Sequence, residues 1–304
     1  MIDYKRIIKN KKLRLRILDA LGFVPDSTML KIQYYLKTGR KLNIKSPKRW
    51  TEKIQWYKIN YRVPLMAQCV DKFDVRQYVE SVGLDYLLNE CYGVFSSPDE
   101  IDFSKLPNQF VLKDTLAGGS SSVIICTDKT KADLKEYKTR MWEWVRANTK
   151  SNFGREWVYD GRRHRIIIDK YIDPECEEGL IDYKFFCFNG KVSHEIVISD
   201  RFTGEKLDLY TTTWKRMKVA QSDCPNQREQ NLPKPENFDE MLKIAETLSK
   251  PFPHVRVDLY NIHGKILFGE LTFFSASGYY IFTPDKFDFW LGNKFELPQK
   301  NIEV

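Results

Sequence analysis

Short hydrophobic runs separated by polar turns are frequent in the last two thirds of the chain. Residues 255–260 and 266–273 are rich in β-branched and aromatic side chains, and His263 and Gly264 between them supply a turn. This pattern predicts an antiparallel hairpin. Further runs of strand length occur at residues 110–113, 123–126, 165–172 and 181–192, the last of them with Asn189-Gly190 as a hairpin turn.

The first third of the chain has spacings that are typical of helices. A helix is predicted over residues 72–82 and one short strand at residues 92–95, and further helices are predicted over residues 131–150 and 237–249. We therefore expect an α+β protein with a mainly helical N-terminal region followed by two strand-bearing regions. The expected bounds of the three parts are 1–105, 106–168 and 169–304.

The predicted C-terminal hairpin contains two carboxylates, Asp258 and Glu270, in otherwise apolar surroundings. If their registers match, the two lie side by side on one face of a sheet. Carboxylates are seldom buried without a partner, and a hard cation with oxygen ligands would suit the pair, assisted by Thr272 or Asn261. Arg256 lies on the same face as Asp258, so an anion would complete such a site. A structural ion pair between Arg256 and these carboxylates explains the same residues, and the hairpin alone leaves both interpretations open.

A loop of small residues separates two of the predicted strands. Lys113 ends the first strand, and residues 116–122 have the sequence Leu-Ala-Gly-Gly-Ser-Ser-Ser. Backbone N–H groups at such a tip can approach phosphates closely. The loop is not a P-loop, because no Gly-Lys-Ser/Thr closes it and no helix follows directly.

Composition narrows the class of protein. The chain has 304 residues, 42% of them hydrophobic and 14% aromatic, which excludes a disordered protein. No apolar run approaches the roughly 20 residues that a membrane span needs, and charge within residues 5–16 argues against a signal peptide. The six cysteines form no Cys-x-x-Cys pair, which favours reduced thiols in a cytoplasmic protein. The four histidines lack zinc spacing.

The net charge of +8 raises the question of an anionic partner, and nucleic acid is one option. Nucleic acid is not expected, since no helix-turn-helix, zinc-finger or RNP segment occurs. Residues 4–18 carry seven Lys or Arg among apolar residues. This segment either rests on an anionic membrane surface as a peripheral contact or packs one helical face on the protein body.

Taken in order, these segments resemble the ATP-grasp enzymes, and most closely their TupA-like branch, which is associated with teichuronopeptide and capsular polysaccharide synthesis. The resemblance covers roughly residues 40–298. The segments that carry it are Leu42-Asn43, Glu52-Lys53-Ile54-Gln55-Trp56, Asp71-Lys72-Phe73, Leu106-Pro107-Asn108-Gln109-Phe110-Val111-Leu112-Lys113, Arg155-Glu156-Trp157, Asp182-Tyr183-Lys184-Phe185 and Gly269-Glu270-Leu271-Thr272.

The resemblance implies two α+β subdomains that hold ATP between them, with the phosphate hairpin in residues 106–168 and the metal site in residues 169–304. The residues implied to bind nucleotide are Lys72, Lys113, Gly118, Gly119, Ser120, Ser121, Asp169, Lys170, Tyr171, Ile172, Asp182 and Lys184, of which Asp169 to Ile172 form the hinge that holds adenine and Asp182 is the candidate for the ribose. Asp258, Glu270 and, with less support, Thr272 are the implied Mg²⁺ ligands. Arg256, Lys113 and Lys184 are the implied catalytic cations.

The activity implied is an ATP-dependent carboxylate–amine ligation through an acyl phosphate. The family association points to a uronic acid of a cell-surface polysaccharide or its precursor as the carboxylate, and to an amino acid or small amine as the second substrate. Two alternatives remain open. A glycosyltransferase usually has an Asp-x-Asp motif, which this chain lacks, whereas a phosphotransferase with a sugar hydroxyl as acceptor would use the same ATP site.

Overall fold

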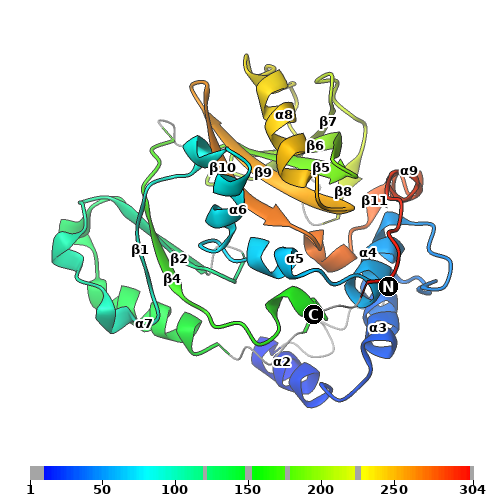
Figure 1. Cartoon of the computed structure of the whole chain (residues 1–304), viewed down its shortest axis with the longest axis horizontal. Helices are drawn as coiled ribbons and strands as arrows, with labels where there is room; N and C mark the ends of the chain where they lie inside the picture. Colours follow the sequence, from blue (N-terminus) through cyan, green and yellow to red (C-terminus); the bar gives the residue numbers. More distant parts are fainter. Residues whose placement is uncertain (1–9, 119–121, 148–152, 175–178, 223–226, 302–304) are drawn as a thin grey trace.

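The computed structural model describes residues 10–118, 122–147, 153–174, 179–222 and 227–301. Two antiparallel sheets form its framework (Figure 1). The small sheet has the strand order β1 (Cys91–Phe95), β4 (Ile166–Lys170), β2 (Phe110–Asp114), β3 (Val123–Cys126). The large sheet has the order β10 (Lys265–Thr272), β9 (His254–Ile262), β5 (Asp182–Phe188), β6 (Lys191–Ser199), β7 (Lys206–Thr211). A two-stranded ribbon pairs β8 (Ala220–Gln221) with β11 (Phe282–Thr283).

The α+β prediction is confirmed, as are the two predicted hairpins and the strands at 92–95, 110–113, 123–126 and 165–172, whose bounds differ by a few residues. The pattern did not predict β7, β8 or β11. β1 belongs to the mainly helical first region but pairs with β4, and the expected boundary at 168/169 falls within β4. The small sheet is therefore assembled from all three of the expected parts.

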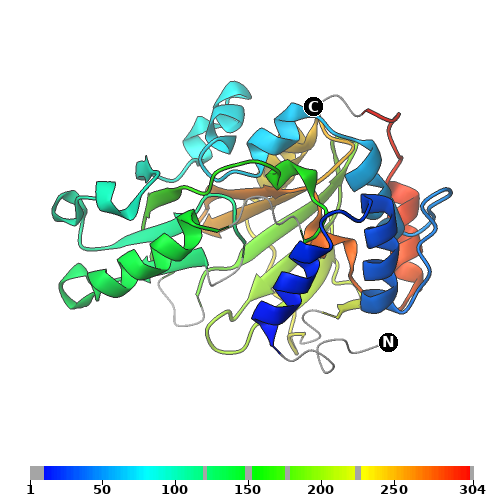
Figure 2. The same cartoon turned by 90° about the horizontal axis from the view of Figure 1, so that it is seen from below.

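The described helices lie mostly in the N-terminal region and over the outer faces of the sheets. They are α2 (Lys11–Ala20), α3 (Asp26–Thr38), α4 (Trp50–Asn60), α5 (Pro64–Cys69), α6 (Val75–Ser81), α7 (Leu134–Val145), α8 (Phe238–Ser249) and α9 (Lys286–Lys294). Seen from below, α2 lies between α7 and α3 (Figure 2).

Two helices begin later than the pattern predicts, and in each case an aspartate explains the difference. The helix expected from residue 72 begins at Val75, because the Asp71 carboxylate accepts the backbone N–H groups of Phe73 and Asp74 and forms a turn there. The helix expected from residue 131 begins at Leu134, where Asp133 caps the first turn.

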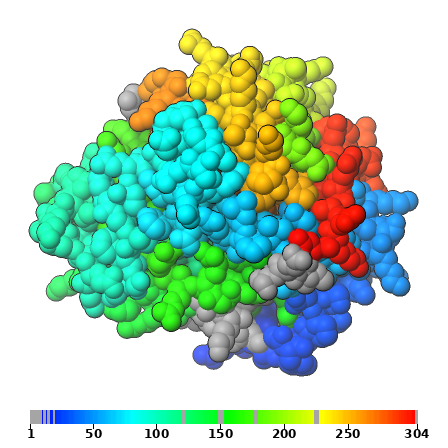
Figure 3. Space-filling model, in the orientation of Figure 1, coloured from blue at the N-terminus to red at the C-terminus, as the bar shows by residue number. Residues whose placement is uncertain are grey.

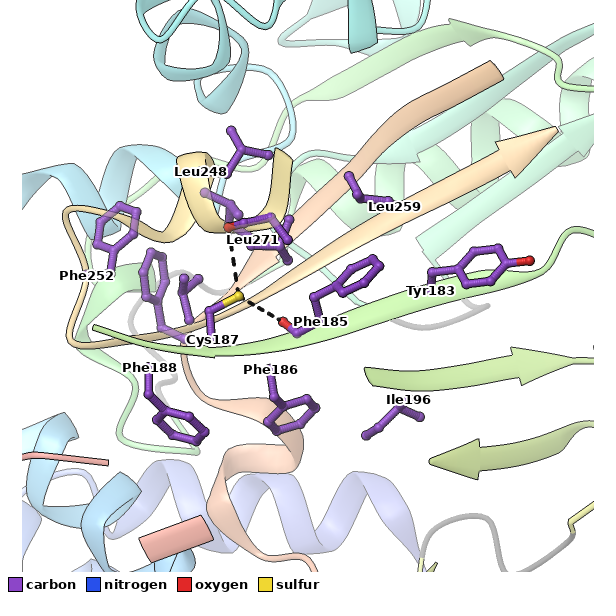
Figure 4. Packing of buried hydrophobic residues seen from close by; sticks show 14 of the residues in the cluster. Tyr183, Phe185, Phe186, Cys187, Phe188, Ile196, Leu248, Phe252, Leu259 and Leu271 are labelled. Carbon is purple, nitrogen blue, oxygen red and sulfur yellow. Dashed lines mark hydrogen bonds between the residues drawn. The ribbon is translucent and has the colours of Figure 1, made fainter. Parts of the chain in front are cut away.

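Each sheet has one face that is packed against a helix. Alternate residues of the small sheet, among them Phe110, Leu112 and Ile168, pack with Met141 and Trp144 of α7. In the large sheet, Leu248 of α8 and Cys187 lie on the opposite side of β5 from Phe186 and Phe188 (Figure 4). The remaining face of each sheet is therefore available for a site.

The face of the large sheet opposite α8 is partly covered by segments from the N- and C-terminal parts of the chain. Trp50 of α4 stacks on Tyr280 with ring centroids 5.8 Å apart and donates to Nε2 of His254 at 3.3 Å. Phe287 of α9 packs on His194. These contacts bury one half of that face, and the other half carries the charged residues described next.

Candidate functional site

Asp258 and Glu270 are directly opposed on β9 and β10, and a β-bulge puts them there. From the turn onward the strands pair regularly as far as Phe268 with Leu259, and then the register shifts by one residue. Without this shift Glu270 would oppose Val257 and point to the other face of the sheet. Gly269 fits at the bulge because a Cβ on it would come within 3.0 Å of the Asp258 carbonyl oxygen. The side-by-side carboxylates that the sequence predicted are present.

Arg256 bridges these two carboxylates. Its Nε and Nη2 donate to the two oxygens of Asp258, both at 2.6 Å, and Nη2 also donates to Glu270 Oε1 at 2.9 Å. Thr272, which pairs with Arg256 across the strands, accepts from Nη2 at 3.0 Å and donates to Glu270 Oε1 at 3.1 Å. The ion pair that the sequence offered as an alternative is therefore formed in this structure.

The cluster keeps its charges although it is buried. Asp258 is 2% exposed; burial acts to raise its pKa, but the charges of Arg256 and Lys184 hold the pKa below its usual value. Burial likewise opposes the charge on Arg256, and Asp258 and Glu270 raise its pKa further above the usual range. Glu270 differs from Asp258 and Arg256 in its exposure to solvent, since 41% of its side chain is exposed.

Lys184 and Asp182 on β5 extend the cluster. Lys184 is the cross-strand partner of Asp258 and its ammonium contacts that carboxylate, with Asp182 Oδ1 3.6 Å away. Asp182, the predicted ribose ligand, is paired with Arg201. A ribose hydroxyl at Asp182 would therefore have to share the carboxylate with Arg201.

The second group of predicted residues lies on the face of the small sheet that α7 does not cover. Lys113 Nζ donates to Asp169 Oδ2 at 2.8 Å, and the other Asp169 oxygen is buried without a hydrogen-bond partner among the described residues. Val111 and Ile167 are the cross-strand partners of Asp169 and Lys113. This face therefore combines an apolar surface with one lysine and one carboxylate.

The predicted hinge follows β4. The Lys170 backbone N–H donates to the Glu90 carbonyl at 2.9 Å, and its carbonyl accepts from Asn89 Nδ2 at 2.7 Å. Tyr171 and Ile172 follow, half-buried, on the way to β5. Of the small-residue loop, Gly118 is exposed, while Gly119, Ser120 and Ser121 lie outside the described residues.

Lys72 connects the two groups. Its backbone N–H donates to the Thr115 carbonyl at 2.9 Å and its Nζ to the Ala117 carbonyl at 2.6 Å, at the base of the small-residue loop. Burial lowers the pKa of Lys72, and the charges of Glu270 on the large sheet and of Lys113 on the small sheet both act on it. Figure 3 shows the α5–α6 region, which contains Lys72, over the middle of the molecule. Charges from both sheets therefore act on Lys72.

Sequence reasoning assigned no role to Tyr159, although the charges of Glu270 and Arg256 act on its hydroxyl. It is the last residue of η6 (Trp157–Tyr159), two residues after the end of the segment Arg155-Glu156-Trp157. That segment contributed to the resemblance and was the one available signal for Tyr159.

The donor set near Glu270 suits a hard cation only in part. Glu270 and Thr272 offer partly exposed carboxylate and hydroxyl oxygens, which are the donors that Mg²⁺ prefers. Both Asp258 oxygens are engaged by cationic side chains and would have to exchange them for a metal. Within the described part of the chain no group of three or more His, Cys, Asp or Glu is arranged to hold a metal.

Comparison with known proteins decides the family. The model of the TupA-like ATPgrasp family matches residues 52–296. The chain belongs to this family. None of the curated proteins matched its sequence. Among the ranges that the structure describes, no helix is long and apolar enough to span a membrane.

The chain is also similar, at low sequence identity, to several solved structures. D-alanine–D-alanine ligase from Bacillus anthracis is 17% identical with a TM-score of 0.41, over 67% of this chain and 56% of that enzyme. The corresponding ligase from Helicobacter pylori is 14% identical with a TM-score of 0.43, over 82% and 68%. Biotin carboxylase from Campylobacter jejuni is 13% identical with a TM-score of 0.39, over 76% and 47%. The chain thus spans about half the length of two of these enzymes.

Proposed function

We propose that this TupA-like ATP-grasp protein is an ATP-dependent carboxylate–amine ligase that acts through an acyl phosphate. The observation that carries the proposal is the position of Lys72, whose ammonium donates to the Ala117 carbonyl at 2.6 Å at the base of the small-residue loop and is acted on by the charges of Lys113 and Glu270. Two sheets that present charged faces to a common lysine suit a polyanion held between them.

In this proposal ATP lies between the two sheets. Its purine packs on the apolar face around Val111 and Ile167, next to the hinge at Tyr171. Lys113 and Lys72 donate to the phosphate oxygens, and Gly118 to Ser121 contribute backbone N–H groups. Phosphates would replace Asp169 and the Ala117 carbonyl as partners of these two lysines.

Glu270, Thr272 and Asp258 would hold Mg²⁺, which, when bound, neutralises charge on the transferring phosphoryl group. Release of Asp258 from Arg256 and Lys184 frees both cations for the substrates. Arg256 and Lys184 then donate charge-assisted hydrogen bonds to the phosphoryl and carboxylate oxygens. The ion pairs of this structure therefore hold in place the groups that the reaction needs.

The proposed chemistry has two steps. A substrate carboxylate oxygen attacks the γ-phosphorus, and the bond from that phosphorus to ADP breaks, which gives an acyl phosphate. An uncharged amine then attacks the acyl carbon, while Arg256 stabilises the oxyanion of the tetrahedral intermediate. The bond from that carbon to the phosphate oxygen breaks, and the departing phosphate takes up the proton that the nitrogen loses. No side-chain nucleophile is required for either step.

We further propose that the carboxylate is a uronic acid of a cell-surface polysaccharide or its precursor and that the second substrate is an amino acid or small amine. The resemblance to the TupA-like branch supports this substrate class, and a cytoplasmic site of action, by analogy. The basic segment 4–18 supports a peripheral contact with the inner face of the membrane, where such precursors are assembled.

Hydroxylamine tests the ligase proposal because it intercepts acyl phosphates. Incubation with Mg²⁺-ATP, glucuronic acid or UDP-glucuronic acid, and hydroxylamine should give a hydroxamate, with ADP and phosphate in equal amounts. Arg256→Ala should suppress the reaction about 100-fold, by analogy with the loss of an oxyanion donor. A stable phosphorylated sugar without hydroxamate would support the phosphotransferase, and sugar transfer without ATP turnover would support the glycosyltransferase.

A further inference from the structure

Almost all of the net charge of the protein lies in its first 40 residues. Residues 1–40 contain ten Lys or Arg and three Asp, which gives a net charge of +7 out of +8 for the whole chain. Residues 41–304 therefore carry a net charge of only +1. The excess positive charge thus belongs to α2, α3 and the segment before them, and the ATP site proposed above does not account for it.

α2 has an apolar stripe that the rest of the protein leaves uncovered. Leu13, Ile17 and Ala20 follow one another at spacings of four and three residues, so they lie along one face of the helix. All three are exposed, and so is Arg16, which lies on the same face. The solvent side of α2 therefore combines apolar side chains with a base.

α3 has a second stripe of the same kind. Lys31, Ile32 and Tyr35 are exposed and share one face of the helix, whereas Leu30 and Tyr34 are buried in the protein. The buried side chains fix the rotation of α3, so its exposed stripe points away from the body. Figures 1 and 3 show α2 and α3 together at one end of the molecule, on the far side from α8.

The turn between these helices holds Phe23 in solvent. Phe23 is 83% exposed. The turn around it is fixed, because Arg155 donates to the carbonyls of Leu21 and Gly22 at 2.9 and 3.4 Å and to the Asp26 carboxylate at 2.9 Å. The exposed ring is therefore carried by a segment that is tied to the protein body before and after it.

These exposed residues form one surface, the α2–α3 face, which consists of Leu13, Arg16, Ile17, Phe23, Lys31, Ile32 and Tyr35. Of the ten exposed large hydrophobic side chains among the described residues, five belong to it. Apolar side chains interspersed with bases suit an anionic bilayer, because the former enter the boundary between headgroups and acyl chains and the latter bind the headgroups. Nucleic acid would account for the charge but not for the apolar side chains, and a second copy of the chain would bring like charges together.

We propose that the α2–α3 face docks this protein on an anionic lipid bilayer, with Phe23 inserted between the headgroups. The contact suggested by the charge of segment 4–18 is thereby extended to α3 and to the turn, and it gains an apolar component. Docking requires neither ATP nor turnover, so this proposal and the ligase proposal fail separately.

Flotation with vesicles of phosphatidylglycerol and phosphatidylcholine tests the apolar component. The full chain should float with these vesicles and not with vesicles of phosphatidylcholine alone. Phe23→Ser should lower the partition coefficient about tenfold, because the ring no longer leaves water. Tyr86→Ser, at an exposed aromatic residue between α6 and β1, is the matched control and should leave the partition coefficient unchanged.

A charge reversal tests the electrostatic component. Lys31→Glu should lower the partition coefficient about tenfold at low ionic strength and less at high ionic strength, because salt screens the attraction to the headgroups. Lys243→Glu, at an exposed base of α8, is the matched control and should have little effect.

Four results would overturn the assignment. They are the absence of binding to anionic vesicles, equal losses in the test and control variants, binding that salt abolishes but Phe23→Ser leaves unchanged, and a dimer in sedimentation velocity that Phe23→Ser dissociates. The third would show adsorption by charge alone, and the fourth would make the face a contact between two copies. In the hydroxamate assay with soluble substrates Phe23→Ser should match the wild-type protein, and inactivity of the wild-type protein there would count against the ligase and not against docking.

Discussion

His254 and Asp258 are four residues apart on the same face of β9, and both are buried, yet they differ in charge. His254 packs against Trp50 and Phe188, and burial lowers its pKa to about 3, so the ring is neutral. Asp258 is held as a charged carboxylate by Arg256 and Lys184. β9 therefore carries a neutral side chain where it lies in the core and a charged one where it reaches the site. A buried group keeps its charge only where opposite charges lie beside it.

Glu195 shows that a shifted pKa alone does not identify the site. It lies on β6, on the face under α8, where burial raises its pKa to about 9. Neither of its carboxylate oxygens has a hydrogen-bond partner among the described residues. The site differs from this position because its charged groups come from several strands and meet at partly exposed side chains such as Glu270.

The largest effect is expected from Asp258→Asn, which removes the counter-charge at the site end of β9. Arg256 and Lys184 would remain buried with their main partner neutral, and breaking such a buried pair costs about 3–5 kcal/mol of unfolding free energy. Urea unfolding measures this loss. A cost below about 1 kcal/mol would show that the cluster is solvated like a surface ion pair, and the contrast with His254 would disappear.

Glu270→Gln should separate function from stability within the same cluster. Its side chain is 41% exposed, so we expect little change in unfolding free energy. Turnover in the hydroxamate assay should fall at least about 100-fold, because a charged ligand for the transferring phosphoryl group is replaced by a neutral one. Turnover within a few-fold of wild type would remove Glu270 from the metal site. Glu240→Gln, at an exposed carboxylate of α8, serves as the control.

Local patterns predicted most strands and the candidate residues, but not how those residues come together. Regular pairing from the His263-Gly264 turn would have placed Asp258 and Glu270 on opposite faces, and the bulge at Gly269 brings them to one face. A bulge of this kind leaves no periodic signal, although a glycine inside a strand is compatible with one.

Contacts between distant segments were beyond prediction for a different reason. Lys72 contacts the loop base through Ala117, and the charges of Arg256 and Glu270 act on Tyr159, although these segments are far apart in sequence. Their positions depend on how α5, α6 and η6 pack between the sheets, which periodicity does not encode. The resemblance marked both segments without giving a role to Tyr159.

His194→Phe tests whether a histidine buried in the core beside the large sheet is uncharged. His194 stacks on Phe186 at 4.7 Å, and burial lowers its pKa to about 3. Between pH 6.5 and 3 the unfolded chain binds a proton that the folded protein does not, so this group makes unfolding free energy fall as the pH falls, by about 1.4 kcal/mol per pH unit. The variant should lose that share of the acid sensitivity, as measured by urea unfolding at pH 5 and 6.5, with His254 still contributing its own. An unchanged slope would mean that His194 is not held neutral.

The smallest effect is expected from Thr272→Val, which is nearly isosteric and leaves every charge of the site in place. The hydroxyl accepts from Arg256 and donates to Glu270, so its loss should cost about 1 kcal/mol of unfolding free energy. As a neutral metal ligand it should contribute less than Glu270, and turnover should fall about tenfold, with a higher Mg²⁺ concentration needed for half-maximal rate. A Mg²⁺ titration of ADP release measures this. An unchanged Mg²⁺ dependence would restrict Thr272 to orienting Arg256 and Glu270, and would leave the two carboxylates as the metal ligands.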